Sequence, residues 1–118
     1  MLEKYPIGIA GPDLNQISRE YTGLVASSTN FVLAMLSNSW RAFLDALKES
    51  EPALLIVYAD IATGPDALKD ILSKLQRAVV IVLLPSNWAQ FTGVFEGLDR
   101  VRRVFVLPAA PKEVLAAG

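Results

Sequence analysis

Two carboxylates and one hydroxyl of this chain each follow a short apolar run, and these residue types could do chemistry if they are brought together. Asp13 follows IGIAGP, Asp60 follows LLIVYA and Ser86 follows VVIVLLP. Carboxylate oxygens can bind a cation such as Mg²⁺, and a hydroxyl can donate or accept a hydrogen bond. These side chains could act together only if the apolar runs end at one edge of the same sheet.

Histidine and cysteine, which carry much of enzyme chemistry, are both absent from the 118 residues. Serine–histidine triads, cysteine nucleophiles and metal sites built from His or Cys are therefore excluded. Carboxylate, lysine and tyrosine chemistry remains, but these residues form no recognisable catalytic constellation. We predict that the chain is not an enzyme and that it binds no metal and no cofactor.

Charge is balanced, with 11 basic and 12 acidic residues, so no global field attracts nucleic acid or an anionic membrane. Arg100, Arg102 and Arg103 form the only basic cluster in the sequence. The cluster is too narrow for a nucleic-acid interface, and we expect it at a solvated edge or at a partner contact. The segment GIAGPD lacks the dinucleotide fingerprint and the P-loop lysine, so nucleotide binding is not expected.

Apolar runs alternate with amphipathic stretches along the whole chain. This pattern predicts strands at 5–10, 31–36, 54–58, 79–84 and 101–107, and helices at 13–25, 39–50, 65–75, 87–99 and 111–117. Asp13 and Ser39 are predicted N-caps, and Pro65 suits the first turn of its helix. The stripe expected to be buried in the first helix consists of Leu14, Ile17, Tyr21 and Leu24.

Continuous apolar strands that alternate with helices predict an α/β fold, with a parallel sheet between two helix layers. Five strands in 118 residues suit one flavodoxin-like (βα)5 domain, doubly wound, with strand order 2-1-3-4-5 and three αβα layers. The longest apolar run, 78–84, is too short to span a membrane. The N-terminus is not a secretory signal, so we expect a cytoplasmic location.

Three segments resemble the receiver domains of response regulators, the CheY-like family. EPALLIVYADI is similar to the family's third strand, VVIVLLP to the fourth, and FVLPAAPKEVL to the fifth strand and its exit. The resemblance covers the whole chain in element order. It implies a signalling domain with an acidic pair after the first strand, a phosphorylated Asp after the third, a hydroxyl after the fourth and a Lys after the fifth.

Counted with the family spacing, none of these positions holds the residue that phosphorylation needs. The acidic pair, the acceptor, the hydroxyl and the lysine fall, in that order, on Gly11 and Pro12, Tyr58, Leu84 and Leu107. A tyrosine cannot form an acyl phosphate, and a leucine cannot neutralise one. In this register the resemblance implies a degraded phosphorylation site.

A second register keeps a working site open as an alternative. If each strand runs two residues longer, Asp13, Asp60 and Ser86 reach the strand ends, because a shift of two preserves the face of each side chain. No lysine replaces the missing one, since Lys112 is predicted in the last helix. Simpler roles are an N-cap for Asp13, a turn for Asp60, and for Tyr58 a core-edge aromatic whose hydroxyl lies in water.

We predict a non-phosphorylated pseudo-receiver that docks to another protein or to itself. The resemblance places the contact on the fourth helix, fifth strand and fifth helix, where the arginine cluster falls. It also makes two parent proteins plausible, a pilus-assembly localisation ATPase of the CpaE/TadZ type and a transcription regulator, so the chain is expected to be a module of a longer protein. The alternatives are a working receiver phosphorylated at Asp60 and a small flavodoxin-like ligand-binding domain or enzyme.

Overall fold

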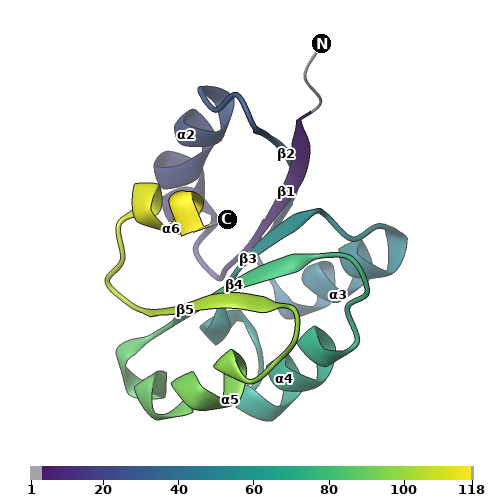
Figure 1. Ribbon diagram of the computed structural model, residues 1–118, viewed down its shortest axis with the longest axis vertical. Helices are drawn as coiled ribbons and strands as arrows, with labels where there is room; N and C mark the ends of the chain where they lie inside the picture. Colours follow the sequence, from purple (N-terminus) through teal and green to yellow (C-terminus); the bar gives the residue numbers. More distant parts are fainter. Residues whose placement is uncertain (1–3, 118) are drawn as a thin grey trace.

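The computed structural model describes residues 4–117 and has a five-stranded sheet at its centre (Figure 1). The strands are β1 (Tyr5–Ala10), β2 (Phe31–Ser37), β3 (Leu54–Tyr58), β4 (Val79–Leu84) and β5 (Val101–Val106). All neighbouring strands are parallel, and their order is β2-β1-β3-β4-β5. The predicted flavodoxin-like topology is therefore confirmed.

Helices cover both faces of this sheet, as predicted for a three-layer fold (Figure 1). The α1 face is covered by α6 (Pro111–Ala117) and by one continuous helical segment composed of α1 (Leu14–Ile17), η1 (Ser18–Thr22) and α2 (Gly23–Ala26). The α3 face is covered by α3 (Trp40–Glu49), α4 (Pro65–Ser73), and α5 (Thr92–Glu96) with the preceding 3₁₀ turn η3 (Ser86–Phe91). A second 3₁₀ turn, η2 (Ala59–Ile61), follows β3.

The central strands are buried on both faces because each face has its own helix layer. Alternate side chains of a strand point to opposite faces. Ile56 and Ile81 lie in the core of the α1 face, Leu55 and Val57 lie in the core of the α3 face, and all four are fully buried. This double burial explains the unbroken apolar sequences of β3 and β4.

Local sequence signals start the helices where they were predicted. The Asp13 carboxylate accepts a hydrogen bond from the Gln16 N–H at 3.1 Å, and the Ser39 hydroxyl accepts one from the Ala42 N–H at 3.2 Å. Pro65 is the first residue of α4, where its missing N–H costs nothing. Within residues 4–117, none of the helices has the length and apolar character needed to cross a membrane.

The first helical segment departs from the predicted spacing. Its buried residues are Ile17, Tyr21 and Val25, whereas Leu14 is 37% exposed and Leu24 is only half-buried. The segment η1 is a π-helix, which has more residues per turn than an α-helix and so displaces the inward-facing stripe along the chain. The expectation that Leu14 and Leu24 belong to the buried stripe is therefore wrong.

The connection between β4 and β5 is less regular than the single helix predicted at 87–99. It consists of η3 followed by the short α5, which ends at Glu96 with Gly97 as its C-cap. Trp88 and Phe91 form a T-shaped pair, with ring centroids 6.1 Å apart, against the core of the α3 face. Phe95 is fully buried in this core, and Trp88 and Phe91 pack against it while partly exposed.

The second register assumed that each strand runs two residues longer, and this assumption is wrong. β3 ends at Tyr58 because the chain turns into η2, and β4 ends at Leu84, directly before Pro85. A proline has no N–H to donate to a neighbouring strand, which favours the end of a strand at this point. The strand ends therefore follow the first register.

At the amino ends of the strands, the Glu51 carboxylate connects the loop before β3 to the loop before β4 by hydrogen bonds. It accepts hydrogen bonds of 2.9 to 3.1 Å from the backbone N–H groups of Gln76, Arg77 and Ala78. Burial alone would raise the pKa of Glu51, but these hydrogen bonds and the nearby Arg100 outweigh it and hold the pKa below its ordinary value of 4.5. These hydrogen bonds stabilise the edge of the sheet at the amino ends of β3 and β4.

Candidate functional site

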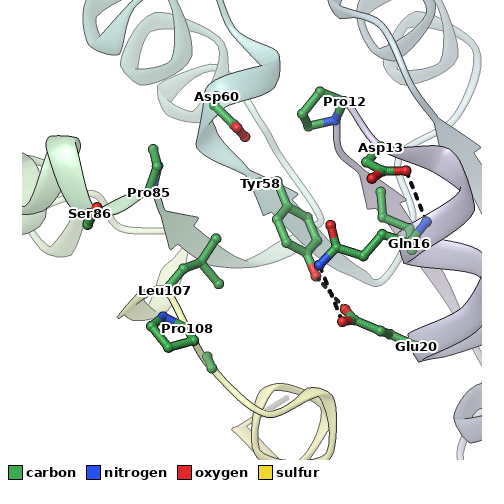
Figure 2. A pocket seen from close by; sticks show the side chains of 12 residues that line it. Pro12, Asp13, Gln16, Glu20, Tyr58, Asp60, Pro85, Ser86, Leu107 and Pro108 are labelled. Atoms are coloured by element: carbon green, nitrogen blue, oxygen red, sulfur yellow. Dashed lines mark hydrogen bonds between the residues drawn. The ribbon is translucent and has the colours of Figure 1, made fainter.

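A pocket of about 470 Å³ lies at the carboxyl ends of β1, β3, β4 and β5 (Figure 2). Ligands of doubly wound sheets bind in crevices at this edge. The pocket is lined by Pro12, Asp13, Gln16, Ile17, Glu20, Tyr58, Asp60, Pro85, Ser86, Leu107, Pro108 and Ala109. The residues of both predicted registers therefore meet at one place, except Gly11 and Leu84, which do not line the pocket.

Tyr58 occupies the position at the end of β3 that the resemblance assigns to the phosphate acceptor. It is 8% exposed, and its ring packs edge-to-face against Tyr21 with centroids 6.4 Å apart. Its hydroxyl donates towards the Tyr21 hydroxyl at 3.2 Å and the Glu20 carboxylate at 3.4 Å. The expectation that this hydroxyl lies in water is wrong, because the first helical segment covers the strand end (Figure 2).

Burial raises the pKa of both tyrosines of this pair. The pKa of Tyr58 is raised well above its ordinary value of 10.0, first by burial and then by its hydrogen bond to Tyr21 and the charge of Glu20. The pKa of Tyr21 is also raised, mainly by burial. Neither hydroxyl is therefore available as a base or as an anionic nucleophile at neutral pH.

Gly11 and Pro12 stand where the resemblance expects an acidic pair. Gly11 is buried, and a Cβ at this position would lie 2.6 Å from Cδ1 of Ile17 and 2.9 Å from the Tyr58 ring. An aspartate could not be placed there without displacing both side chains. Gly11 thus permits close packing between the exit of β1 and Tyr58, and Pro12 lies exposed at the rim of the pocket.

Leucines occupy the predicted hydroxyl and lysine positions. Leu84 is the last residue of β4, is fully buried in the core of the α3 face and does not line the pocket. Leu107 follows β5 and lines the pocket beside Pro108, to which it is joined by a cis peptide bond. Both positions are therefore apolar where a phosphorylation site needs polar or cationic groups.

Asp13, Asp60 and Ser86 all line the pocket, but each comes from a different element (Figure 2). Asp13 is the N-cap of α1, as predicted, and its carboxylate is engaged by the Gln16 N–H. Asp60 lies exposed in the turn η2, and Ser86 is the exposed first residue of η3. Within the described part of the chain, no three His, Cys, Asp or Glu residues are arranged to hold a metal ion.

The ionisable groups that line the pocket are acidic or phenolic. Asp13, Glu20 and Asp60 supply carboxylates, whereas no lining residue is Lys or Arg. Lys112 of α6 lines a separate groove with Arg19, in agreement with the expectation that it lies too far along the last helix. A phosphoryl group carries about two negative charges at neutral pH and would find no fixed cation here.

The arginine cluster lies outside this pocket. Arg100 donates a hydrogen bond to the backbone carbonyl of Gln76. Arg102 and Arg103 are exposed on β5, an outer strand of the sheet, and the Arg103 guanidinium lies 4.6 Å from the centroid of the Phe105 ring. A partner contact at this surface stays a prediction.

Gln16 and Glu20, which line the pocket, were not predicted as site residues, and Tyr21 was predicted only as a buried residue of the first helix. Gln16 donates its side-chain amide to the Glu20 carboxylate at 3.3 Å, and Glu20 and Tyr21 accept from Tyr58. The available signal was the spacing of four between Gln16 and Glu20 on a helix capped by Asp13, which places them on one side of the helix. Regular α-helical spacing gave no reason to place that side over the end of β3.

The chain is similar in structure to RcsB, a response regulator from Salmonella enterica serovar Typhimurium, solved bound to promoter rprA in the presence of the phosphomimetic BeF3-. The TM-score is 0.75 and the sequence identity 15%, and the match covers 98% of this chain and 58% of the RcsB chain. At this identity the similarity shows the fold, which is that of a receiver domain. No family model and no curated protein matches this sequence.

Proposed function

Because the chain has the fold of a response-regulator receiver domain, we propose that it is a pseudo-receiver. It is a signalling or localisation module in the cytoplasm that is not phosphorylated and that acts by binding another protein or a second copy of itself. It catalyses no reaction and needs no cofactor. Since a fold does not determine a function, the proposal rests on the chemistry of the pocket.

The observation that carries the proposal is the residue at the end of β3. A phosphate acceptor needs an available carboxylate beside a metal ion and a cation. Tyr58 is instead a neutral, buried side chain that is hydrogen-bonded to Tyr21 and Glu20. Leu107, at the position of the lysine, offers no charge to an incoming phosphoryl group.

The charge of the pocket supports the same proposal. A phosphoryl group on Asp60 would face the carboxylates of Asp13 and Glu20 across one pocket. Two like charges 4 Å apart repel by about 1 kcal/mol even in bulk water, and by more near a protein surface. With no lysine or arginine lining the pocket, this repulsion would be uncompensated.

A working receiver is the second candidate, and one observation favours it. Asp13, Asp60 and Ser86 line the same pocket, although β3 and β4 end before the last two. In that case Asp60 would be the acceptor and Ser86 would donate a hydrogen bond to the phosphoryl group. The missing cation is the main argument against this candidate.

Phosphorylation with a small donor separates the two candidates. The protein is incubated with Mg²⁺ and acetyl phosphate, and its intact mass is measured, with a known receiver domain as the positive control. We expect no phosphoryl adduct on this chain. A stoichiometric adduct that persists in Asp66→Asn, an exposed position in α4, but disappears in Asp60→Asn would establish the working receiver instead.

We propose that the surface formed by η3, α5, β5 and α6, with the arginine cluster at its rim, contacts a protein partner. These elements correspond to the fourth helix, fifth strand and fifth helix of the predicted fold. The chain covers 58% of the RcsB chain, which in its solved structure is bound to a promoter. By analogy, we propose that the chain is one module of a longer protein, such as a transcription regulator or a pilus-assembly ATPase.

A further inference from the structure

The two outer strands of the sheet differ sharply in charge. β2 and β5 end the strand order, so among the described residues each has one edge without a neighbouring strand. Such an edge presents unpaired backbone N–H and C=O groups that can pair with another chain. β5 has the sequence VRRVFV, with two exposed arginines, whereas β2 has the sequence FVLAMLS and no charged residue.

β2 also exposes apolar side chains. Val32 is 47% exposed and Leu36 is 37% exposed, and Ala34 between them is exposed as well. Soluble proteins usually protect an edge strand with Lys, Pro, a bulge or a short length. β2 has only one of these protective features, a bulge-like irregularity. Its pairing register with β1 shifts between Ile7 and Gly8, so that Ala34 has no partner residue in β1. Val32, Ala34 and Leu36 are thus exposed along this strand without a charged neighbour in it.

We propose that the edge of β2 binds β2 of a second copy of this chain. Antiparallel pairing about a two-fold axis would join the two five-stranded sheets into one continuous sheet. In this arrangement the strand complements itself, because each N–H that faces the free edge of one copy meets a C=O of the other. The partner of the interaction module proposed above is then a second copy of the chain, and the functional meaning of this dimer rests on that proposal.

The distribution of charge favours β2 over β5 as the pairing edge, and it permits a second copy as the partner. Two β2 strands bring no like charges together, and the net charge of the chain is only −1, which gives little long-range repulsion. Two β5 strands would oppose Arg102 and Arg103 of one copy to the same residues of the other, and like charges on facing strands destabilise pairing. The arginine surface is better suited to an acidic protein partner.

The expected affinity is modest. A pair of short strands buries less than the roughly 1,200 Å² of a specific, stable interface, so further contacts must come from the exposed apolar side chains. We therefore expect a reversible dimer in the micromolar range, in rapid exchange with the monomer. Its formation should be visible as a dependence of mass on concentration.

Sedimentation velocity across a concentration series, from low micromolar to near millimolar, tests this inference. The wild-type protein should shift from monomer to dimer. Val32→Lys and Leu36→Lys should each weaken the dimer at least about tenfold, because each change removes an exposed apolar side chain from the paired strand and adds a positive charge to it in both copies. The matched control is Val106→Lys on β5, which is 40% exposed and should leave the dimer unchanged.

Hydrogen exchange of the wild-type protein provides a test that needs no variant to fold. Amides of 31–37 should exchange more slowly at high concentration than at low concentration, whereas those of β5 should not change. A monomer at every concentration would overturn this inference and leave the phosphodonor assay to judge the pseudo-receiver independently. A dimer that survives Val32→Lys, shows no protection in β2 and is lost on reversing the charge of Arg102 and Arg103 would assign the contact to the β5 side.

Discussion

Removal of the Tyr58 hydroxyl tests the hydrogen-bonded tyrosine pair that occupies the acceptor position. Tyr58→Phe keeps the ring, and with it the edge-to-face packing on Tyr21, so it leaves no cavity of consequence. It removes the hydrogen bonds to the Tyr21 hydroxyl and the Glu20 carboxylate. Any loss of stability therefore reports on these hydrogen bonds.

The magnitude follows from the exposure of the two groups that lose their partner. Glu20 is half-buried and can turn to water, so its loss contributes little. Tyr21 is 1% exposed, and an unsatisfied buried hydroxyl costs about 1–3 kcal/mol. We expect Tyr58→Phe to lower the free energy of unfolding by about 1–2 kcal/mol, and Tm by roughly 4–8 °C.

The same hydrogen bonds predict a dependence on alkaline pH. Because the folded state raises the pKa of Tyr58 and Tyr21 above 10.0, their contribution is complete below pH 10 and is lost as the pH rises further. Tyr58→Phe cannot ionise at this position, so it should lose less stability above pH 10 than the wild-type protein. The difference between the two proteins should therefore shrink at alkaline pH.

Urea denaturation at pH 7 and above pH 10 measures both effects. The matched control is Tyr5→Phe, because Tyr5 is 63% exposed and should tolerate the change at either pH. The double variant with Tyr21→Phe should be more stable than the sum of the single changes predicts, since both single changes break the same bond. If Tyr58→Phe costs no more than Tyr5→Phe at pH 7, the reasoning about the buried pair is refuted.

Three further changes test the fold that holds the pocket. In urea titrations Glu51→Gln should cost about 1–2 kcal/mol at pH 7, because it weakens hydrogen bonds to three backbone N–H groups. It should also weaken the loss of stability below pH 4.5, because the lowered pKa of Glu51 makes its contribution vanish as the pH falls. Glu49→Gln, at an exposed position of α3, should cost little at pH 7. Gly11→Ala should cost about 1–3 kcal/mol by thermal melting, whereas Gly93→Ala, with open space around its Cβ, should be neutral or stabilising. Phe43→Ala should cost about 3–5 kcal/mol in urea, because Phe43 is fully buried, and a cost near zero would contradict its place in the core.

The strands could be predicted closely because both faces of the sheet are covered. Full burial on both faces requires an unbroken apolar run, and LLIVY and VVIVLL match β3 and β4 residue for residue. The caps Asp13 and Ser39 were also predictable, since they act through hydrogen bonds to residues three positions along the chain. The order of the strands was predicted because five strands that alternate with helices in 118 residues suit the flavodoxin-like arrangement.

The inside of the pocket was harder to predict because it depends on one non-local contact. The π-helical segment η1 changes which side chains of the first helical segment point to the core. The regular spacing of apolar residues does not predict a π-helix. The segment η1 brings Glu20 and Tyr21 over Tyr58, which lies 37 residues from Tyr21 in the sequence. The sequence alone therefore predicts that the Tyr58 hydroxyl is solvated, because it does not show that this helical segment lies over the end of β3.

The central claim is that the pocket takes no phosphoryl group, and a phosphoryl analogue tests it most directly. Backbone amide resonances of the labelled protein are followed by NMR as Mg²⁺ and beryllofluoride are added, alone and together. We predict no saturable shifts at Asp13, Asp60 or Ala109, the residues that would surround the analogue. Saturable shifts at these residues that require both additions and disappear in Asp60→Asn would contradict the account.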